Sequence, residues 1–230
     1  MRAALLLLAL LALPAQAECV ILLHGLARSA GSMAELAEFL AERGYQVVNV
    51  DYPSRHYRIE ELADVAIPAA LDQCTTPGKV HFVTHSMGGI LVRQYLAHHR
   101  LDNLGRVVML APPNQGSEVV DTLGTVPGFE WWNGEAGLQL GTGPDSLPLA
   151  LGPANFELGI IAGTASINPM LSTIIPGEDD GKVSVERARL VGMSDFLTVP
   201  ATHTFLMQNQ EVMHQVAHFL REGQFRHEAD

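Results

Sequence analysis

The sequence predicts an α/β fold, a three-layer sandwich in which a mainly parallel sheet lies between two layers of helices. The first observation is that short apolar runs alternate along the chain with segments whose apolar residues recur at helical spacing. The second is that these runs are apolar at nearly every position, as expected of strands covered on both faces. With 230 residues, 47% of them hydrophobic, the chain is long enough for one domain with a large core.

The elements follow one another in the order strand, helix, strand, which favours parallel pairing. The expected strands lie in segments 19–25, 44–53, 79–84, 106–113, 157–164 and 195–199. The expected helices lie in segments 32–44 and 59–73, from 86 onward, and in 205–220. Ser32 and Glu35 have the spacing of a capping box for the first helix, and we expect Pro68 to bend or break the second.

The segment at about 112–155 has a different character. It is rich in Gly and Pro, contains both tryptophans, Trp131 and Trp132, and has one convincing short helix near 119–123. We interpret it as an irregular, cap-like insertion over one end of the sheet, because such insertions commonly shape a ligand pocket. The alternative is a disordered surface loop.

The first 17 residues have the pattern of a secretory signal peptide, with one Arg, an apolar run and small residues before Glu18. The apolar run is too short to span a bilayer, so we expect no stable membrane anchor. The expected mature domain is 18–230, exported to a periplasm or beyond the cell. In such an oxidising compartment a disulfide between Cys19 and Cys74 is plausible if their strands are neighbours, and two unrelated buried thiols are the alternative.

The charge of the chain excludes some partners. Without Arg2 the expected mature chain has 13 basic and 25 acidic residues and no run of Lys or Arg. This balance repels phosphate backbones, so we expect no nucleic-acid partner.

A serine lies at an abrupt change from strand to helix in "KVHFVTHSMGGILVRQYLAHH". Thr84, Ser86 and Gly88 form a T-x-S-x-G pattern, with one departure from the G-x-S-x-G of nucleophile elbows. Such a corner presents a hydroxyl above the sheet, beside the unpaired amides of a helix start. The amides of Leu26, after the His24-Gly25 turn, and Met87 are candidate donors to an oxyanion.

A nucleophilic serine needs a base and an acid that orients the base. The late segment "PGEDDGKVSVERARL" contains Asp179 and Asp180, and "VPATHTFLM" contains His203 between a strand and the last helix. We favour His203 over His214 and His218, which lie within that helix and lack further metal ligands. Spacing does not separate the two aspartates.

The motifs "LLHGLARS", "THSMGG", "LAPPNQGS", "DDGKVSV" and "THTFLM", in this order, resemble the α/β-hydrolase superfamily, and particularly its secreted bacterial lipase- and esterase-like members. The resemblance implies Ser86 as nucleophile, His203 as general base and Asp180 as orienting acid. It also implies Leu26 and Met87 as oxyanion donors. Similar lipases often hold Ca²⁺ near the histidine loop, but the sequence offers no full ligand set for it, so we expect no metal or other cofactor. The small number of strands suggests a compact version of the fold.

These observations lead to the hypothesis of a hydrolase that cleaves carboxylic esters through an acyl-enzyme. A small-molecule or lipid ester is the expected substrate, bound with help from His24, Trp131 and Trp132 and with transient contact to a lipid interface. The alternatives are an amidase or acyltransferase with the same residues, and a non-catalytic binding or assembly protein of the same fold.

Overall fold

A computed structural model describes residues 17–227, so the predicted signal peptide lies almost entirely outside the described residues. Six strands form one sheet in the order β2-β1-β3-β4-β5-β6, and every pair is parallel. The strands are β1 Cys19–Leu23, β2 Gln46–Val50, β3 Val80–His85, β4 Leu104–Leu110, β5 Leu158–Gly163 and β6 Asp195–Val199. The predicted α/β class and the parallel sheet are confirmed.

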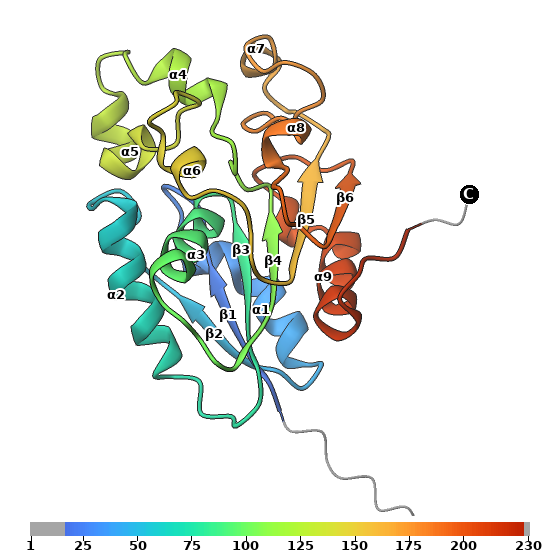
Figure 1. Ribbon diagram of the computed structural model, residues 1–230. Coiled ribbons are helices and arrows are strands. Elements are labelled where there is room, and N and C mark those ends of the chain that lie inside the picture. Colours follow the sequence, from blue (N-terminus) through green and yellow to red (C-terminus); the bar gives the residue numbers. More distant parts are fainter. Residues whose placement is uncertain (1–16, 228–230) are drawn as a thin grey trace, which may run out of the picture.

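Helices cover both faces of this sheet (Figure 1). Alternate residues of β1 divide the core: Val20 and Leu22 pack with α1 (Ala34–Ala41) and α9 (Gln210–Glu222) on one side. Ile21 and Leu23 pack with α2 (Ile59–Leu71) and α3 (Met87–His98) on the other. Both faces of a strand that is apolar throughout are thus buried, which confirms the three predicted layers.

One local prediction, the cap of the first helix, is wrong. The Ser32 hydroxyl donates to the Ser29 carbonyl at 2.8 Å within a short 3-10 turn, Ala30–Met33, so it does not cap α1. At Pro68, where we expected a bend or a break, helix α2 is not broken and continues as one element. Pro68 lies in its last turns, and the burial of Ile67 and Ala70 against the core outweighs the one hydrogen bond that the proline removes.

Cys19 and Cys74 form a disulfide, with their Cα atoms 5.7 Å apart. Cys19 begins β1 beside Val80 of β3, so the two strands whose adjacency the pairing required are neighbours. The bond ties the start of the sheet to the connection that follows α2. Closing a loop of 55 residues restricts the unfolded chain and stabilises the fold by about 4 kcal/mol in the chain-entropy description.

The segment between β4 and β5 lies above the carboxyl ends of the strands (Figure 1). It contains three short helices where the sequence analysis expected one: α4 Glu118–Leu123, α5 Phe129–Leu138 and α6 Leu147–Ala150. The remaining helical turns are α7 Pro169–Ser172, α8 Val185–Ala188 and Leu206–Gln208. Gln139 joins this segment to α2, because its side chain accepts the Ile59 amide at 2.8 Å and donates to Glu60 at 2.6 Å.

Candidate active site

Ser86 occupies the corner between β3 and α3 with a positive φ of 53°. This conformation is strained for a residue with a Cβ and turns the chain sharply enough to begin a helix at the next residue. Gly88 makes the corner possible, since a Cβ there would lie 2.5 Å from the Leu23 carbonyl oxygen of the neighbouring strand. The corner is therefore packed directly against β1.

Thr84, the departure from the usual motif, is accommodated by a second glycine. It is completely buried, and a Cβ added to Gly89 would lie 3.2 Å from its hydroxyl oxygen. The absence of a side chain at Gly89 leaves room for the threonine side chain. Thr84 and Gly89 thus pack together behind the corner.

Three side chains from distant parts of the chain meet at this corner. The Ser86 Oγ lies 3.0 Å from Nε2 of His203, and Nδ1 of His203 lies 2.7 Å from Oδ2 of Asp180. His203 and Asp180 are 4% and 2% exposed, so their interaction is shielded from water. With its proton on Nδ1, the imidazole donates to the carboxylate and accepts from the serine hydroxyl.

The two neighbouring aspartates have separate positions. Asp180 accepts the amides of Lys182 and Val183 through Oδ1, at 3.0 and 2.9 Å, which leaves Oδ2 for His203. Asp179 instead accepts the Ser172 hydroxyl at 2.8 Å and the Gly181 amide at 2.7 Å. Asp180 therefore orients the imidazole, whereas Asp179 closes its own loop.

His85 is a further residue of the site, which the sequence analysis did not single out. It is 1% exposed, and its Nε2 lies 2.9 Å from the His203 carbonyl oxygen. Burial, followed by the charge of His203, lowers the pKa of His85 well below its ordinary value. The neutral ring donates to the backbone of His203 and fixes the loop that carries the imidazole. The position of His85 directly before Ser86 in the sequence could have identified it as a residue of the site.

His24 does not occupy the substrate-binding position suggested for it. Its ring is completely buried and stacks on Tyr52 at a centroid distance of 4.1 Å. The Tyr52 hydroxyl donates to the His24 carbonyl, and burial lowers the pKa of the His24 ring. The polar ring can be buried because it stacks on Tyr52 and both ring nitrogens have hydrogen-bond partners. His24 therefore supports the turn after β1, and it does not line the cavity.

The two candidate oxyanion donors lie on either side of Ser86 in the fold. Met87 begins α3, and Leu26 follows the turn after β1, where Gly25 packs against His85 and Ser86. Within residues 17–227, neither the Leu26 amide nor the Met87 amide donates a hydrogen bond. Both amides are thus available to an acceptor beside the serine.

A cavity of about 460 Å³ opens beside Ser86 and His203. The insertion supplies most of its apolar wall, with side chains from α4, α5 and the turn between them: Val119, Val120, Leu123, Val126, Phe129 and Trp132. Of the two tryptophans suggested for substrate binding, only Trp132 lines the cavity. Trp131 is 78% exposed and touches Trp132 edge to face.

The described residues contain no group of three or more His, Cys, Asp or Glu side chains placed to hold a metal ion. His214, considered above as a metal ligand, packs against the Phe39 ring at 5.0 Å. In the same part of the chain, no helix has the length and apolar character needed to cross a membrane.

The fold is shared with several bacterial enzymes. A lipase of Bacillus licheniformis, BlEst2 in its mature form, superposes with a TM-score of 0.65 at 21% identity, covering 90% of this chain and 93% of that one. A metagenomic carboxyl esterase gives 0.68 at 19% identity, covering 84% and 66%. Phospholipase PlaB of Legionella pneumophila gives 0.63 at 17% identity, where 90% of this chain matches 58% of that one. At these identities the likeness establishes the fold.

No match was found among curated proteins. The sequence model of the alpha/beta hydrolase family matches residues 20–218, which contain all of the sheet except Cys19, the corner at Ser86 and the loops of Asp180 and His203. The match spans far more than half of the chain, and the parallel sheet agrees with it. The chain belongs to the alpha/beta hydrolase family.

Proposed function

We propose that this protein is a serine hydrolase that cleaves carboxylic esters through an acyl-enzyme intermediate. The observation that carries the proposal is the continuous hydrogen-bonded series of Ser86, His203 and Asp180 at the mouth of an apolar cavity. Each group has the position that nucleophilic catalysis requires: a hydroxyl next to a base, and a base held by a buried carboxylate.

In the proposed reaction, Ser86 Oγ attacks the ester carbonyl while His203 Nε2 takes the hydroxyl proton. The amides of Leu26 and Met87 stabilise the negative oxygen of the tetrahedral intermediate. His203 then gives the proton to the leaving alcohol oxygen as the carbon–oxygen bond breaks, which leaves the acyl group on Ser86. Water attacks the acyl-enzyme, again losing a proton to His203, and the free acid and the serine hydroxyl are restored.

The cavity supports an acyl group of moderate length as the bound part of the substrate. Its wall is mostly aliphatic and aromatic, and such walls contribute binding through burial of apolar surface. The exposed side chains of Trp131 and Trp132 beside its opening support transient contact with a lipid interface. The disulfide supports an exported protein, because such bonds persist in oxidising compartments.

The test is hydrolysis of 4-nitrophenyl acyl esters of several chain lengths, together with labelling by a fluorophosphonate probe. We expect turnover and labelling by the wild type. Ser86→Ala should lose about 10⁴-fold or more in kcat and all labelling, since it removes the nucleophile. Ser146→Ala, which changes a serine at the start of α6, is the matched control and should keep both.

If Ser86→Ala kept both turnover and labelling, Ser86 would not be the nucleophile. An inactive, unlabelled wild type would instead favour a non-catalytic binding protein. An amidase or acyltransferase would label equally well and be separated by its turnover of the matching anilides or by transfer to added alcohols.

A further inference from the structure

Two basic side chains, Arg28 and Lys182, line the cavity beside Ser86 and His203. None of the described residues that line this cavity is acidic. The whole sequence has the opposite balance, with 25 acidic and 14 basic residues. The cavity is therefore a local positive region in an acidic protein.

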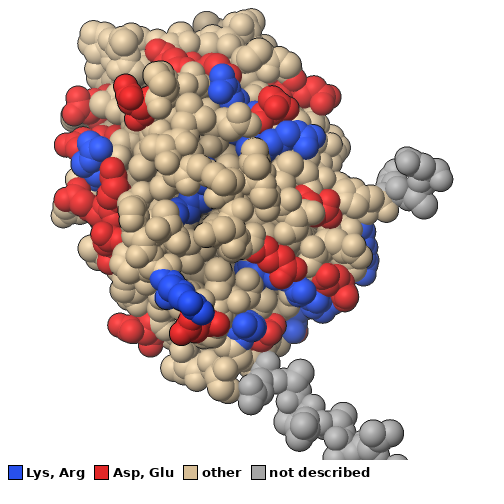
Figure 2. Space-filling model, in the orientation of Figure 1, with Lys and Arg blue, Asp and Glu red and all other residues tan. Residues whose placement is uncertain are grey.

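Among the described residues, neither cation has a carboxylate partner, unlike several other arginines of the protein. Arg106 binds Glu157 at 2.7 Å and Arg187 binds Glu118 at 2.8 Å, and Figure 2 shows basic side chains beside acidic ones across the face in view. Within residues 17–227, Arg28 and Lys182 form no ion pair, and their side chains make no hydrogen bond. No directly bonded carboxylate in the described part of the chain therefore neutralises either charge beside Ser86.

Each of the two basic residues lies two positions along the sequence from a residue that the proposed mechanism uses. Arg28 follows Leu26, the candidate oxyanion donor, and Lys182 follows Asp180, whose carboxylate accepts the Lys182 amide at 3.0 Å. The rigidity of these turns positions the start of each basic side chain. Both residues line the same cavity.

The charges also lie close enough to affect one another. Part of the Lys182 side chain reaches solvent, but desolvation in the cavity lowers its pKa, and the charge of Arg28 lowers it further, against the opposing effect of Asp180. Arg28 and Lys182 both add to the burial and the charge of His203 that lower the pKa of His85. Two nearby like charges repel, and a bound anion would relieve that repulsion.

We propose that Arg28 and Lys182 bind an anionic group of the substrate, so that the preferred substrate is an ester carrying a carboxylate or phosphate near the scissile carbonyl. This inference rests on the proposed ester hydrolysis. Arg28 offers a planar set of donors that matches two oxygens of such a group, and Lys182 adds a second charge. The apolar wall of the insertion would hold the remaining carbon chain of the same substrate.

The experiment compares kcat/KM for matched pairs of esters that differ by one anionic group. Mono-4-nitrophenyl adipate against 4-nitrophenyl hexanoate places the carboxylate in the acyl part. The hexanoate esters of 4-hydroxybenzoate and of 4-hydroxyphenyl phosphate, each against phenyl hexanoate, place a carboxylate or a phosphate in the alcohol part. We expect the wild type to prefer the anionic member of at least one pair by about tenfold or more.

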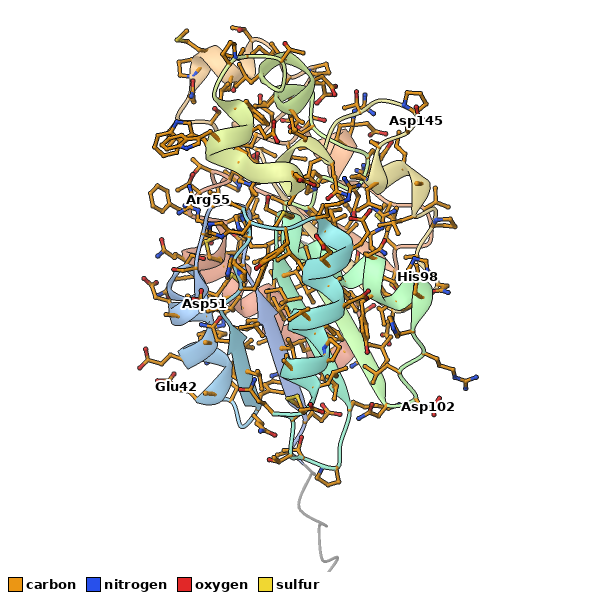
Figure 3. All side chains as sticks on the ribbon, turned by 90° about the vertical axis from the view of Figure 1, so that its left-hand side faces the viewer. Glu42, Asp51, Arg55, His98, Asp102 and Asp145 are labelled. Atoms are coloured by element: carbon orange, nitrogen blue, oxygen red, sulfur yellow. A yellow bond between two sulfur atoms is a disulfide. The ribbon has the colours of Figure 1, made fainter. Side chains whose placement is uncertain are left out.

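In that pair, Arg28→Gln with Lys182→Gln should lower the ratio of anionic to neutral kcat/KM by about tenfold or more, and each single change by less. Arg28→Lys with Lys182→Arg keeps both charges and should keep most of the ratio. Arg100→Gln is the control, since Arg100 pairs with Asp102, which Figure 3 places far from the insertion. For the wild type, 1 M salt should also lower the ratio.

A wild type without an anionic preference in any pair overturns the inference while leaving ester hydrolysis intact. A preference that survives the double Gln change and high salt overturns it as well. If the wild type hydrolyses none of the esters, the proposed function fails, and the inference fails with it.

Discussion

The corner at Ser86 and the insertion above it are held in different ways. At the corner, Gly88 packs against backbone, and a Cβ there would meet a carbonyl oxygen at 2.5 Å, so small shifts are blocked. In the insertion, polar side chains make the bonds to the helices below, with Arg93 of α3 and Gln139 bonded to α2, and Trp131 is 78% exposed.

This difference assigns separate tasks to the two regions. Close packing keeps Ser86 in place, as the proposed catalysis requires, because a displacement near 1 Å is costly for catalysis. Short helices on polar tethers form a wall that can differ in shape while the corner stays the same. Changes at the corner and its partners should therefore affect kcat, and changes in the insertion should affect stability and substrate preference.

The largest effect is expected at the carboxylate behind His203. Asp180→Asn should lower kcat for 4-nitrophenyl esters by about 10³- to 10⁴-fold, because an amide favours the wrong tautomer and does not stabilise the imidazolium. Asp179→Asn is the matched control, and its loss should be below about tenfold because Asp179 contacts its own loop. Equal losses in the two variants would contradict the separate positions described here.

Removing the tether of the insertion should mainly cost stability. Arg93 is 4% exposed and donates to the carbonyls of Asn114, Pro148 and Gly152 at 2.8–2.9 Å. Arg93→Met leaves those buried acceptors unpaired and should lower the free energy of unfolding by about 2–3 kcal/mol, measured by urea denaturation. Arg221→Met, which changes an exposed cation of α9, should stay within about 0.5 kcal/mol. A stable Arg93→Met variant would show that the insertion is held by other contacts.

Lower pH should reduce the free energy of unfolding, because His85 is buried next to the corner. The pKa of His85 is lowered in the folded state by burial and then by His203, so below about pH 6.5 the unfolded chain binds a proton that the folded protein excludes. Stability is then lost as pH falls, by up to about 1.4 kcal/mol per pH unit from this group. His24 and His81 contribute in the same direction, because burial lowers their pKa values too.

The measurement is the free energy of unfolding between pH 7.5 and pH 5 for the wild type and His85→Gln. The slope of the free energy of unfolding against pH reports the number of protons taken up on unfolding. For His85→Gln this number should fall by up to one, whereas His98→Gln, at an exposed position on α3, should keep the wild-type slope. An unchanged slope in His85→Gln would mean that the buried ring takes up a proton in the folded state.

The smallest effect is expected from the tryptophans. Trp132→Ala removes part of the cavity wall and should raise KM for a longer acyl ester about fivefold, with little change for acetate. Trp131→Ala, the neighbouring control, should change KM for soluble esters by less than about twofold, because it is outside the lining. Larger losses for Trp131→Ala would assign it to the soluble substrate after all.

Much of the fold could be predicted because it depends on local pattern. Apolar runs such as β1 had to be buried on both sides, and the serine between a strand and a helix located the corner. The insertion was harder, since α5 has Gly134 at a φ of 65° inside it and no apolar period that identifies a helix. The unformed cap at Ser32 shows that spacing alone does not decide between competing partners for a hydroxyl.

By itself the sequence determined the layered α/β architecture, the corner at Ser86 and the set of residues from which a base and an acid could come. Only the tertiary structure decided that Asp180 and not Asp179 reaches His203, that His24 lies beneath the turn and outside the cavity, and that Arg28 and Lys182 share one opening. The physical reason is that burial periodicity acts between neighbours along the chain, whereas the direction of a side chain in a loop depends on hydrogen bonds and packing with residues far away in sequence.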